Sequence, residues 1–177
     1  MRNEFSTFDI VKALGIPRER LKDWMNNGFV KPTIPAEGQG TKAIFTRVDL
    51  YLTELFRDLL NKGFKRGIAA DFIRKISDIF KLNEKGPGES AEWLAVIIFR
   101  YAQGDNQPVS ANLIADPYKG SIDTAWGQSG IVNLQTGELD TSDSEDWWIF
   151  SENWDYSLTI NFKTLRIRVD KALTVLD

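Results

Sequence analysis

Three short amphipathic segments within the first 80 residues begin and end at recognisable helix signals, and their order constrains the fold more than any other feature. Ser6 and Asp9 are spaced as a capping box, so we expect a helix to begin there. Gly15 is expected to end this helix, because glycine adopts positive φ without steric cost. Pro17 suits the first turn of a second helix, where its missing N–H costs nothing. The sequence therefore predicts two helices joined by a tight turn.

The second predicted helix has one apolar face and one charged face. Leu21, Trp24 and Met25 recur at helical spacing and form its expected buried stripe. The charged side chains between residues 18 and 23 are left on the opposite face. Asn26-Asn27-Gly28 is expected to end the helix.

A small two-stranded wing is predicted after the second helix. Its strands are expected at Phe29–Lys31 and Ala43–Phe45. The loop between them, residues 32–42, consists largely of turn-forming residues.

Two further helices are predicted before residue 82. Thr46 and Asp49 form a second capping box, and Gly63 is expected to end the helix that begins there. The apolar face of the last helix consists of Ile68, Phe72, Ile73, Ile76, Ile79 and Phe80.

Gly86-Pro87-Gly88 is the clearest boundary in the chain, because neither a helix nor a strand crosses such a tripeptide easily. We expect a first domain at 1–82, a linker at 83–90 and a second domain at 91–177. Residues 1–82 hold 15 Lys and Arg against 10 Asp and Glu, whereas the remaining residues hold 7 against 15. This asymmetry indicates two units with different partners.

The second domain is predicted to be α+β, with a mainly antiparallel sheet and a C-terminal helix. Its expected strands are residues 93–99, 109–115, 131–134, 147–150 and 158–162. The apolar period then changes to that of a helix, at Leu165, Val169, Leu173 and Leu176, although Leu165, Ile167 and Val169 also alternate as a strand would. The first domain, in contrast, is expected to be all-α apart from its wing.

The composition excludes several kinds of site. The chain has no cysteine and no histidine, so it lacks thiolate ligands, disulfides and the commonest general base. We therefore expect no catalytic residues, no metal, no cofactor and no enzymatic activity. No apolar run approaches the roughly 20 residues of a membrane span, and no signal-peptide pattern follows the N-terminus. These features predict a cytoplasmic protein without a membrane partner.

Residues 5–80 resemble the winged helix-turn-helix domain of the MerR family of transcription regulators. The matching pieces arrive in the order of the family, from the capped first helix through the turn, the wing and the third helix. They are Phe5-Ser6-Thr7, Asp9-Ile10-Val11-Lys12, Gly15-Ile16, Leu21, Trp24, Gly28-Phe29-Val30-Lys31-Pro32, Phe45-Thr46, Asp49-Leu50 and Gly63-Phe64.

The resemblance implies that the second helix enters the major groove of double-stranded DNA and that the wing reaches the neighbouring backbone or minor groove. The DNA-contacting residues expected from this template are Arg18, Arg20, Lys22, Gln39, Thr41, Lys42, Arg47, Lys65 and Arg66. The alternative is that these side chains form an ordinary solvated surface. A second set of aromatic residues is expected in the core: Trp24, Phe29, Phe45, Phe56 and Phe64.

Two departures from the family pattern limit what the resemblance implies. Glu19 and Asp23 place negative charge on the DNA-facing helix, although a Glu can accept a hydrogen bond from cytosine N4. Gly86-Pro87-Gly88 also interrupts the region where the regulators of this family continue into a long dimerising helix. The target sequence and the homo-oligomeric state are therefore left open.

The acidic second half interleaves carboxylates with tryptophans. Trp126, Trp147, Trp148 and Trp154 lie in a region without Lys or Arg between Lys119 and Lys163. Such a region can bind a cationic or aromatic small molecule through cation–π contacts, or a basic protein. The alternative is a solvated acidic loop over an aromatic core.

The preferred function is a sequence-specific, MerR-like transcriptional regulator whose second domain senses a ligand or forms oligomers. One alternative is an architectural or assembly DNA-binding factor, such as an excisionase-like protein or a viral packaging subunit. Another is a protein–protein adaptor with a winged helix, which Glu19 and Asp23 favour.

Overall fold

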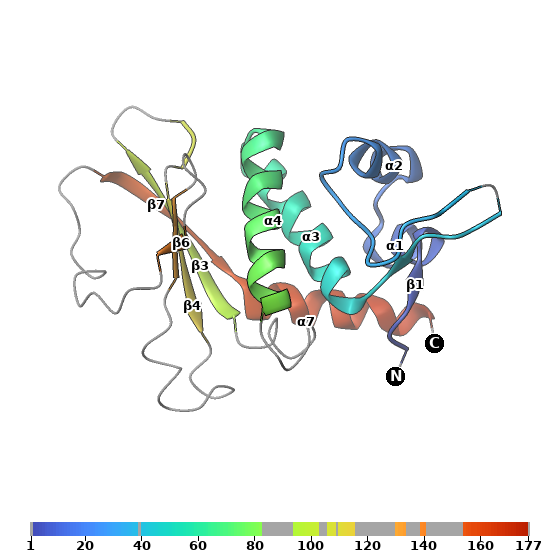
Figure 1. The fold of residues 1–177 in the computed structure, drawn as a ribbon. Helices are drawn as coiled ribbons and strands as arrows, with labels where there is room; N and C mark the ends of the chain where they lie inside the picture. The colour runs from blue at the N-terminus through green and yellow to red at the C-terminus, as the bar shows by residue number, and fades with distance from the viewer. Residues whose placement is uncertain are drawn as a thin grey trace. The chain divides into compact units, whose positions relative to one another are not determined.

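The computed structural model describes residues 2–38, 40–82, 94–102, 106–108, 110–115, 130–133, 139–140 and 154–176. By their contacts the residues group into two units (Figure 1). The first unit comprises Met1–Ile73 together with Thr164–Asp177, and the second comprises Arg74–Lys163. No helix among the described residues is long and apolar enough to cross a bilayer.

The first helix, α1 (Thr7–Leu14), begins and ends as the sequence predicts. The Ser6 hydroxyl accepts a hydrogen bond from the Asp9 amide, and the Asp9 carboxylate accepts one from the Ser6 amide, so both halves of the capping box are present. Gly15 ends the helix in the left-handed region, with φ 64°. The predicted tight turn to α2 (Arg18–Asn26) is confirmed, with Pro17 at the N-cap position, one residue before the predicted first turn.

The predicted strand at Phe29–Lys31 is wrong. The amides of Phe29 and Val30 both donate to the Trp24 carbonyl, at 2.9 and 3.3 Å, and Gly28 adopts φ 70°. These residues therefore wrap the C-terminal end of α2, and their amides are not available for a strand.

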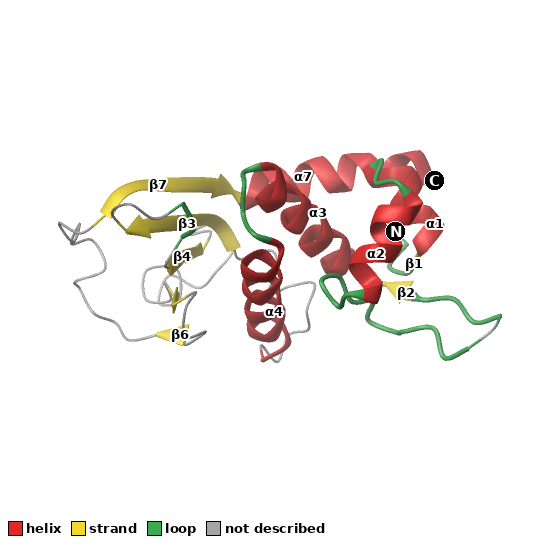
Figure 2. Cartoon of the chain, turned by 90° about the horizontal axis from the view of Figure 1, so that it is seen from above, coloured by secondary structure: helices red, strands yellow, loops and turns green. Residues whose placement is uncertain are grey.

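The two-stranded antiparallel sheet of the first unit has a different first strand. β1 (Phe5–Ser6) pairs with β2 (Ile44–Phe45), so that Phe5 lies opposite Phe45. The wing, residues 32–43, joins this sheet through a single bridge between Ile34 and Ile44. In both views the wing extends away from the helices as a long hairpin-like loop (Figures 1 and 2).

The remaining helices of the predicted winged domain are α3 (Arg47–Asn61) and α4 (Arg66–Leu82). The second capping box is formed as predicted, between Thr46 and Asp49. The side chains that pack these helices together with α1 and α2 are fully buried: Ile10, Leu21, Leu50, Leu55, Phe56, Leu59, Ala69 and Phe72.

The second unit contains a five-stranded sheet in which each neighbouring pair is antiparallel, in the order β6-β5-β4-β3-β7 (Figure 2). Its strands are β3 (Leu94–Ala102), β4 (Ser110–Ala115), β5 (Gly130–Asn133), β6 (Leu139–Asp140) and β7 (Trp154–Asn161). The mainly antiparallel sheet of the predicted α+β fold is confirmed. The strand expected at 147–150 lies outside the described residues.

The predicted C-terminal helix is confirmed as α7 (Phe162–Leu173), followed by the 3₁₀ turn η2 (Thr174–Leu176). Residues 164–177 group with the first unit, whereas the sequence placed them in the second domain. The reason is a set of contacts with α1 and α3. Asp170 accepts hydrogen bonds from Arg47 and Tyr51, and Lys12 donates to the Val175 carbonyl.

Candidate nucleic-acid interface

The basic side chains of α2 are exposed, whereas its apolar side chains Leu21 and Trp24 face the core. Leu21 and Trp24 are buried, whereas Arg18, Arg20 and Lys22 are all exposed. Met25, expected in the buried stripe, is half-buried. At about 100° per residue these cations spread around the solvent side of α2, with Arg18 and Arg20 on opposite flanks and Lys22 between Arg18 and the centre.

Aromatic packing fixes α2 against α3. The Trp24 ring meets the Phe56 ring edge-to-face, with centroids 5.1 Å apart and an interplanar angle of 88°. The Phe29 ring packs on Phe56 at 5.8 Å. Of the five rings predicted to be core, four are buried and Phe29 is half-buried.

The two acids of α2 have different surroundings. Asp23 forms an ion pair with Arg66 at 3.5 Å and accepts a hydrogen bond from the Asn27 amide group at 3.0 Å. Its charge is therefore partly balanced from α4. Glu19 is exposed and makes no ion pair or hydrogen bond with any described residue. The charge of Glu19 is therefore the uncompensated negative charge of α2.

One carboxylate holds the base of the wing. Asp49 Oδ2 accepts hydrogen bonds from the Thr33 amide at 3.0 Å, the Thr33 hydroxyl at 2.7 Å and the Thr46 amide at 2.8 Å. Asp49, the second member of the α3 capping box, therefore also anchors the wing. Backbone hydrogen bonds in both directions between Ile34 and Ile44 add to this attachment.

The outer part of the wing is exposed and turns at glycine. Gly38 and Gly40 adopt φ 155° and 94°. The Thr41 hydroxyl accepts from the Gly38 amide at 3.0 Å and donates to the Gly38 carbonyl at 2.9 Å, which closes the turn. Lys42 is exposed beside it, whereas Gln39 lies outside the described residues.

The other predicted phosphate contacts are placed differently. Lys65 and Arg66 are exposed at the start of α4. Arg47 is half-buried, and its guanidinium donates to Asp170 at 3.2 Å. Tyr51 donates to the same carboxylate at 2.7 Å, and burial together with this hydrogen bond raises the pKa of Tyr51 well above its usual value. The guanidinium of Arg47 therefore bonds to α7.

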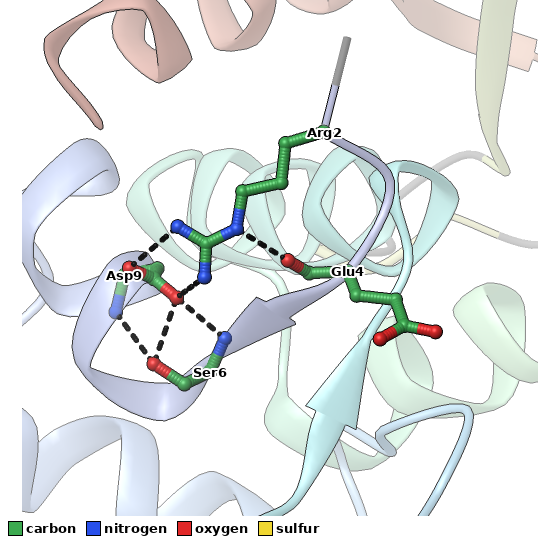
Figure 3. A network of polar contacts seen from close by, with 4 residues as sticks. All are labelled: Arg2, Glu4, Ser6 and Asp9. Carbon is green, nitrogen blue, oxygen red and sulfur yellow. Dashed lines mark hydrogen bonds and ion pairs between the residues drawn. The ribbon is translucent and has the colours of Figure 1, made fainter. Parts of the chain in front are cut away.

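A polar network stabilises the start of α1 (Figure 3). Arg2 donates to both carboxylate oxygens of Asp9, at 3.3 and 2.7 Å, while the Ser6 amide and hydroxyl donate to Oδ2 at 2.7 and 2.8 Å. Burial acts to raise the pKa of Asp9, but the hydrogen bonds from Ser6 and the charge of Arg2 outweigh it. The pKa of Asp9 therefore lies below its ordinary value.

A buried charge cluster between α3 and α7 was not predicted from the sequence. The Glu54 side chain is 1% exposed, and its Oε1 accepts from Arg57 at 2.5 Å and Arg168 at 3.0 Å. Arg168 also binds Asp58 at 2.8 Å. Burial lowers the pKa of Arg168, but Asp58 and Glu54 together raise it above its usual value. The sequence predicted only a helix at residues 165–176, from its apolar spacing. It did not predict the ion pairs of Arg168 with Glu54 and Asp58, because these residues are more than 100 positions away.

Most of the aromatic ligand site predicted from the sequence lies outside the described residues, including Trp126, Trp147 and Trp148. Trp154 is the first residue of β7, where only its backbone is described.

Comparison with known families supports the resemblance seen in the sequence. Residues 5–74 match the model of the MerR HTH family regulatory proteins, so the MerR-like character of this segment is confirmed. The match covers the capped α1, the turn, α2, the wing, α3 and the first half of α4. A search of curated proteins finds no match to the chain.

Proposed function

We propose that this chain, which carries a MerR helix-turn-helix segment at residues 5–74, is a sequence-specific transcriptional regulator. In this proposal α2 enters the major groove of double-stranded DNA, and the wing lies along the flanking backbone or minor groove. The single observation that carries the proposal is that α2 exposes all of its cations while its apolar side chains Leu21 and Trp24 are buried. Trp24 is locked onto Phe56, and Arg18, Arg20 and Lys22 are exposed.

Each basic side chain has a distinct expected role. Arg18 and Arg20 lie in the first turn of α2, where recognition helices reach base edges, and a bidentate Arg–guanine contact gives about 1–3 kcal/mol of discrimination. Lys22, Lys65 and Arg66 are proposed to bind phosphates, and these contacts make binding salt-dependent. Arg66 additionally neutralises Asp23, so that this carboxylate repels the DNA backbone less.

The wing is proposed to contact the backbone through Lys42 and Thr41, which are exposed, and through Gln39, which lies outside the described residues. Asp49 supports this role, because it ties the base of the wing to the start of α3. Arg47 is proposed to stabilise the attachment of α7 through Asp170, and not to bind phosphate.

The second unit is proposed to sense a ligand or to mediate homo-oligomerisation. Its acidic character supports this division of labour, since a surface rich in carboxylates is repelled by DNA. A cationic or aromatic small molecule, or a basic protein, is the partner that its tryptophans and carboxylates suit best.

A salt titration of the full chain on duplex DNA tests the DNA-binding proposal. The logarithm of the affinity is expected to fall linearly with the logarithm of salt concentration, with a slope of about −0.9 per phosphate contact. Lys42→Ala should weaken binding and make the slope shallower by about that amount. Lys171→Ala, on the exposed side of α7, is the control and should bind as the unchanged chain does.

Selection from random duplexes distinguishes a transcriptional regulator from the two alternatives, an architectural or assembly factor and a protein–protein adaptor. A regulator enriches one sequence, whereas an architectural or assembly factor enriches flexible pyrimidine–purine steps without a fixed motif. An adaptor binds no duplex even at low salt. Because Glu19 is the uncompensated acid on α2, a regulator should favour a cytosine at one position of its site.

A further inference from the structure

The first unit contains a cavity to which the proposed function assigns no role. It has a volume of about 280 Å³ and lies where the turn between α1 and α2 meets α3 and α7. Gly15, Ile16 and Pro17 form one side, and polar side chains from three helices, all charged except Asn61, form the rest. This volume is close to the lower end of the range for small-molecule pockets, so a compact metabolite would fill it.

Most of the charges that line this cavity already have partners. Arg57 is bound to Glu54 and to the Leu14 carbonyl, and Arg168 is bound to Glu54 and Asp58. These pairs join α3 to α1 and α7 around the cavity, because Arg57 bonds to the Leu14 carbonyl and Arg168 bonds to Glu54 and Asp58. The hydrogen-bonding groups of these paired side chains have little capacity left to bind a ligand.

Two side chains in the lining, one cationic and one anionic, still have hydrogen-bonding atoms without a partner among the described residues. The guanidinium of Arg20 makes no ion pair or hydrogen bond with any described residue. The Glu54 carboxylate is 1% exposed, yet its Oε2 accepts no hydrogen bond from any described residue. A buried carboxylate oxygen without a donor is unfavourable, and a ligand that displaces the atoms covering Oε2 would supply the missing donor.

The start of α2 adds to the attraction for an anion. Pro17 is the N-cap residue and provides no side-chain hydrogen bond to the first turn. The positive end of the α2 dipole therefore faces the rim of the cavity beside Arg20 without a side-chain cap. Arg20 and this helix end together favour a carboxylate at one end of the ligand.

We propose that this cavity binds a small zwitterion, of which a free α-amino acid is the simplest kind. The ligand carboxylate is held by Arg20 and the start of α2, and its ammonium group donates to Glu54 Oε2. Arg168 contributes to the site from α7, so the site requires the C-terminal helix.

The cavity also offers a route to regulation, and this part of the inference rests on the proposed function. Arg20 is one of the side chains proposed to contact DNA. A ligand that holds Arg20 in the cavity removes it from the groove, so ligand and DNA compete. The bound amino acid should therefore weaken DNA binding.

The experiment uses the full chain and measures thermal unfolding with each of the twenty L-α-amino acids. At least one is expected to raise the unfolding temperature with saturable dependence on concentration. Its N-acetyl derivative, which lacks the ammonium group, should bind about tenfold more weakly or not at all. Absence of any stabilising amino acid would overturn the proposal.

Two variants on α2 locate the binding. Arg20→Ala should weaken binding of the amino acid by about tenfold or more, because it removes the free cation without changing the core. Lys22→Ala, exposed two residues away and absent from the lining, should leave the affinity unchanged. Equal affinity for the unchanged chain and Arg20→Ala would place the ligand elsewhere and overturn the proposal.

DNA titrations with and without the amino acid then test the coupling. The amino acid should weaken DNA binding in the unchanged chain and have no effect on DNA binding by Arg20→Ala. An unchanged DNA affinity in a chain that binds both would overturn the regulatory part. If the chain binds no DNA, the proposed function fails, but the thermal measurements still decide whether the cavity binds a zwitterion.

Discussion

Asp9 shows how one residue at the start of the chain serves both a helix and the N-terminal segment. It caps α1 and receives Arg2 through two hydrogen bonds. Its pKa is lower in the folded chain than in the unfolded chain, so its ionisation stabilises the fold above about pH 4. This contribution is lost as the pH falls below that value.

Replacement of Asp9 by Asn should therefore lower the free energy of unfolding by about 1 kcal/mol at pH 7. The stability of the variant should also depend less steeply on pH between 7 and 3. Urea unfolding at several pH values measures both effects. Glu4→Gln, an exposed carboxylate nearby, should change neither the stability nor its pH dependence. A full pH dependence retained in Asp9→Asn would contradict this role.

Arg66 has two expected effects on DNA affinity, because it supplies a positive charge and neutralises Asp23. Arg66→Ala should weaken DNA binding more than Lys65→Ala does, since only the former exposes the Asp23 charge to phosphates. Adding Asp23→Asn to Arg66→Ala should restore part of the loss. Both partners of this ion pair are largely exposed, so stability should change by less than about 1 kcal/mol.

Binding titrations of the single and double variants on one duplex measure this coupling. If Asp23→Asn has the same effect with and without Arg66, the two residues act independently and the neutralisation argument fails.

At the level of elements, the capping boxes show what local sequence predicts well. Ser6 with Asp9 and Thr46 with Asp49 form within one helical turn, so their spacing is sufficient to place the starts of α1 and α3. The strand expected at Phe29–Lys31 shows the opposite case. Its apolar residues suited a strand, but their amides are taken by the Trp24 carbonyl at the end of α2. The pattern indicated that Gly28 ends the helix, but it did not indicate that the next two amides would donate back to the Trp24 carbonyl.

The wing provides a prediction at the same scale. Asp49→Asn should loosen the wing, because Oδ2 accepts three hydrogen bonds that join Thr33 and Thr46. Amide hydrogen exchange at Thr33 and Thr46 should become faster, while exchange in the centre of α3 should change much less. Thr33→Val, which removes only the hydroxyl, should give a smaller effect. Unchanged exchange at Thr33 in Asp49→Asn would show that the Ile34–Ile44 bridge alone holds the wing.

At the scale of the whole chain, the C-terminal residues complete the unit that begins at the N-terminus. The helical period of α7 was predictable from the sequence, but its placement was not. Its ionic partners Glu54 and Asp58 are separated from Arg168 by more than 100 residues, and nothing in the local pattern identifies them. The exposure of Arg18, Arg20 and Lys22 was predictable, because Leu21 and Trp24 determine which side of α2 is buried.

Loss of the α7 contacts should destabilise the first unit. Arg168→Ala removes one of the two cations bound to the buried Glu54 and should cost about 1 kcal/mol, a modest value because Arg168 is half-exposed. Tyr51→Phe should cost about 0.5–1.5 kcal/mol through the lost hydrogen bond to Asp170. Lys171→Ala is the control. Urea unfolding of the full chain provides the comparison, and equal stability of all four proteins would contradict a structural role for α7.

The central claim is that α2 and the wing contact DNA, and lysine footprinting of the full chain tests it most directly. Acetylation of each lysine is measured by mass spectrometry with and without a duplex obtained by selection. Lys22 and Lys42 should react more slowly when DNA is bound, while Lys171 should react at the same rate. A bound duplex that leaves Lys22 and Lys42 as reactive as before would contradict the claim.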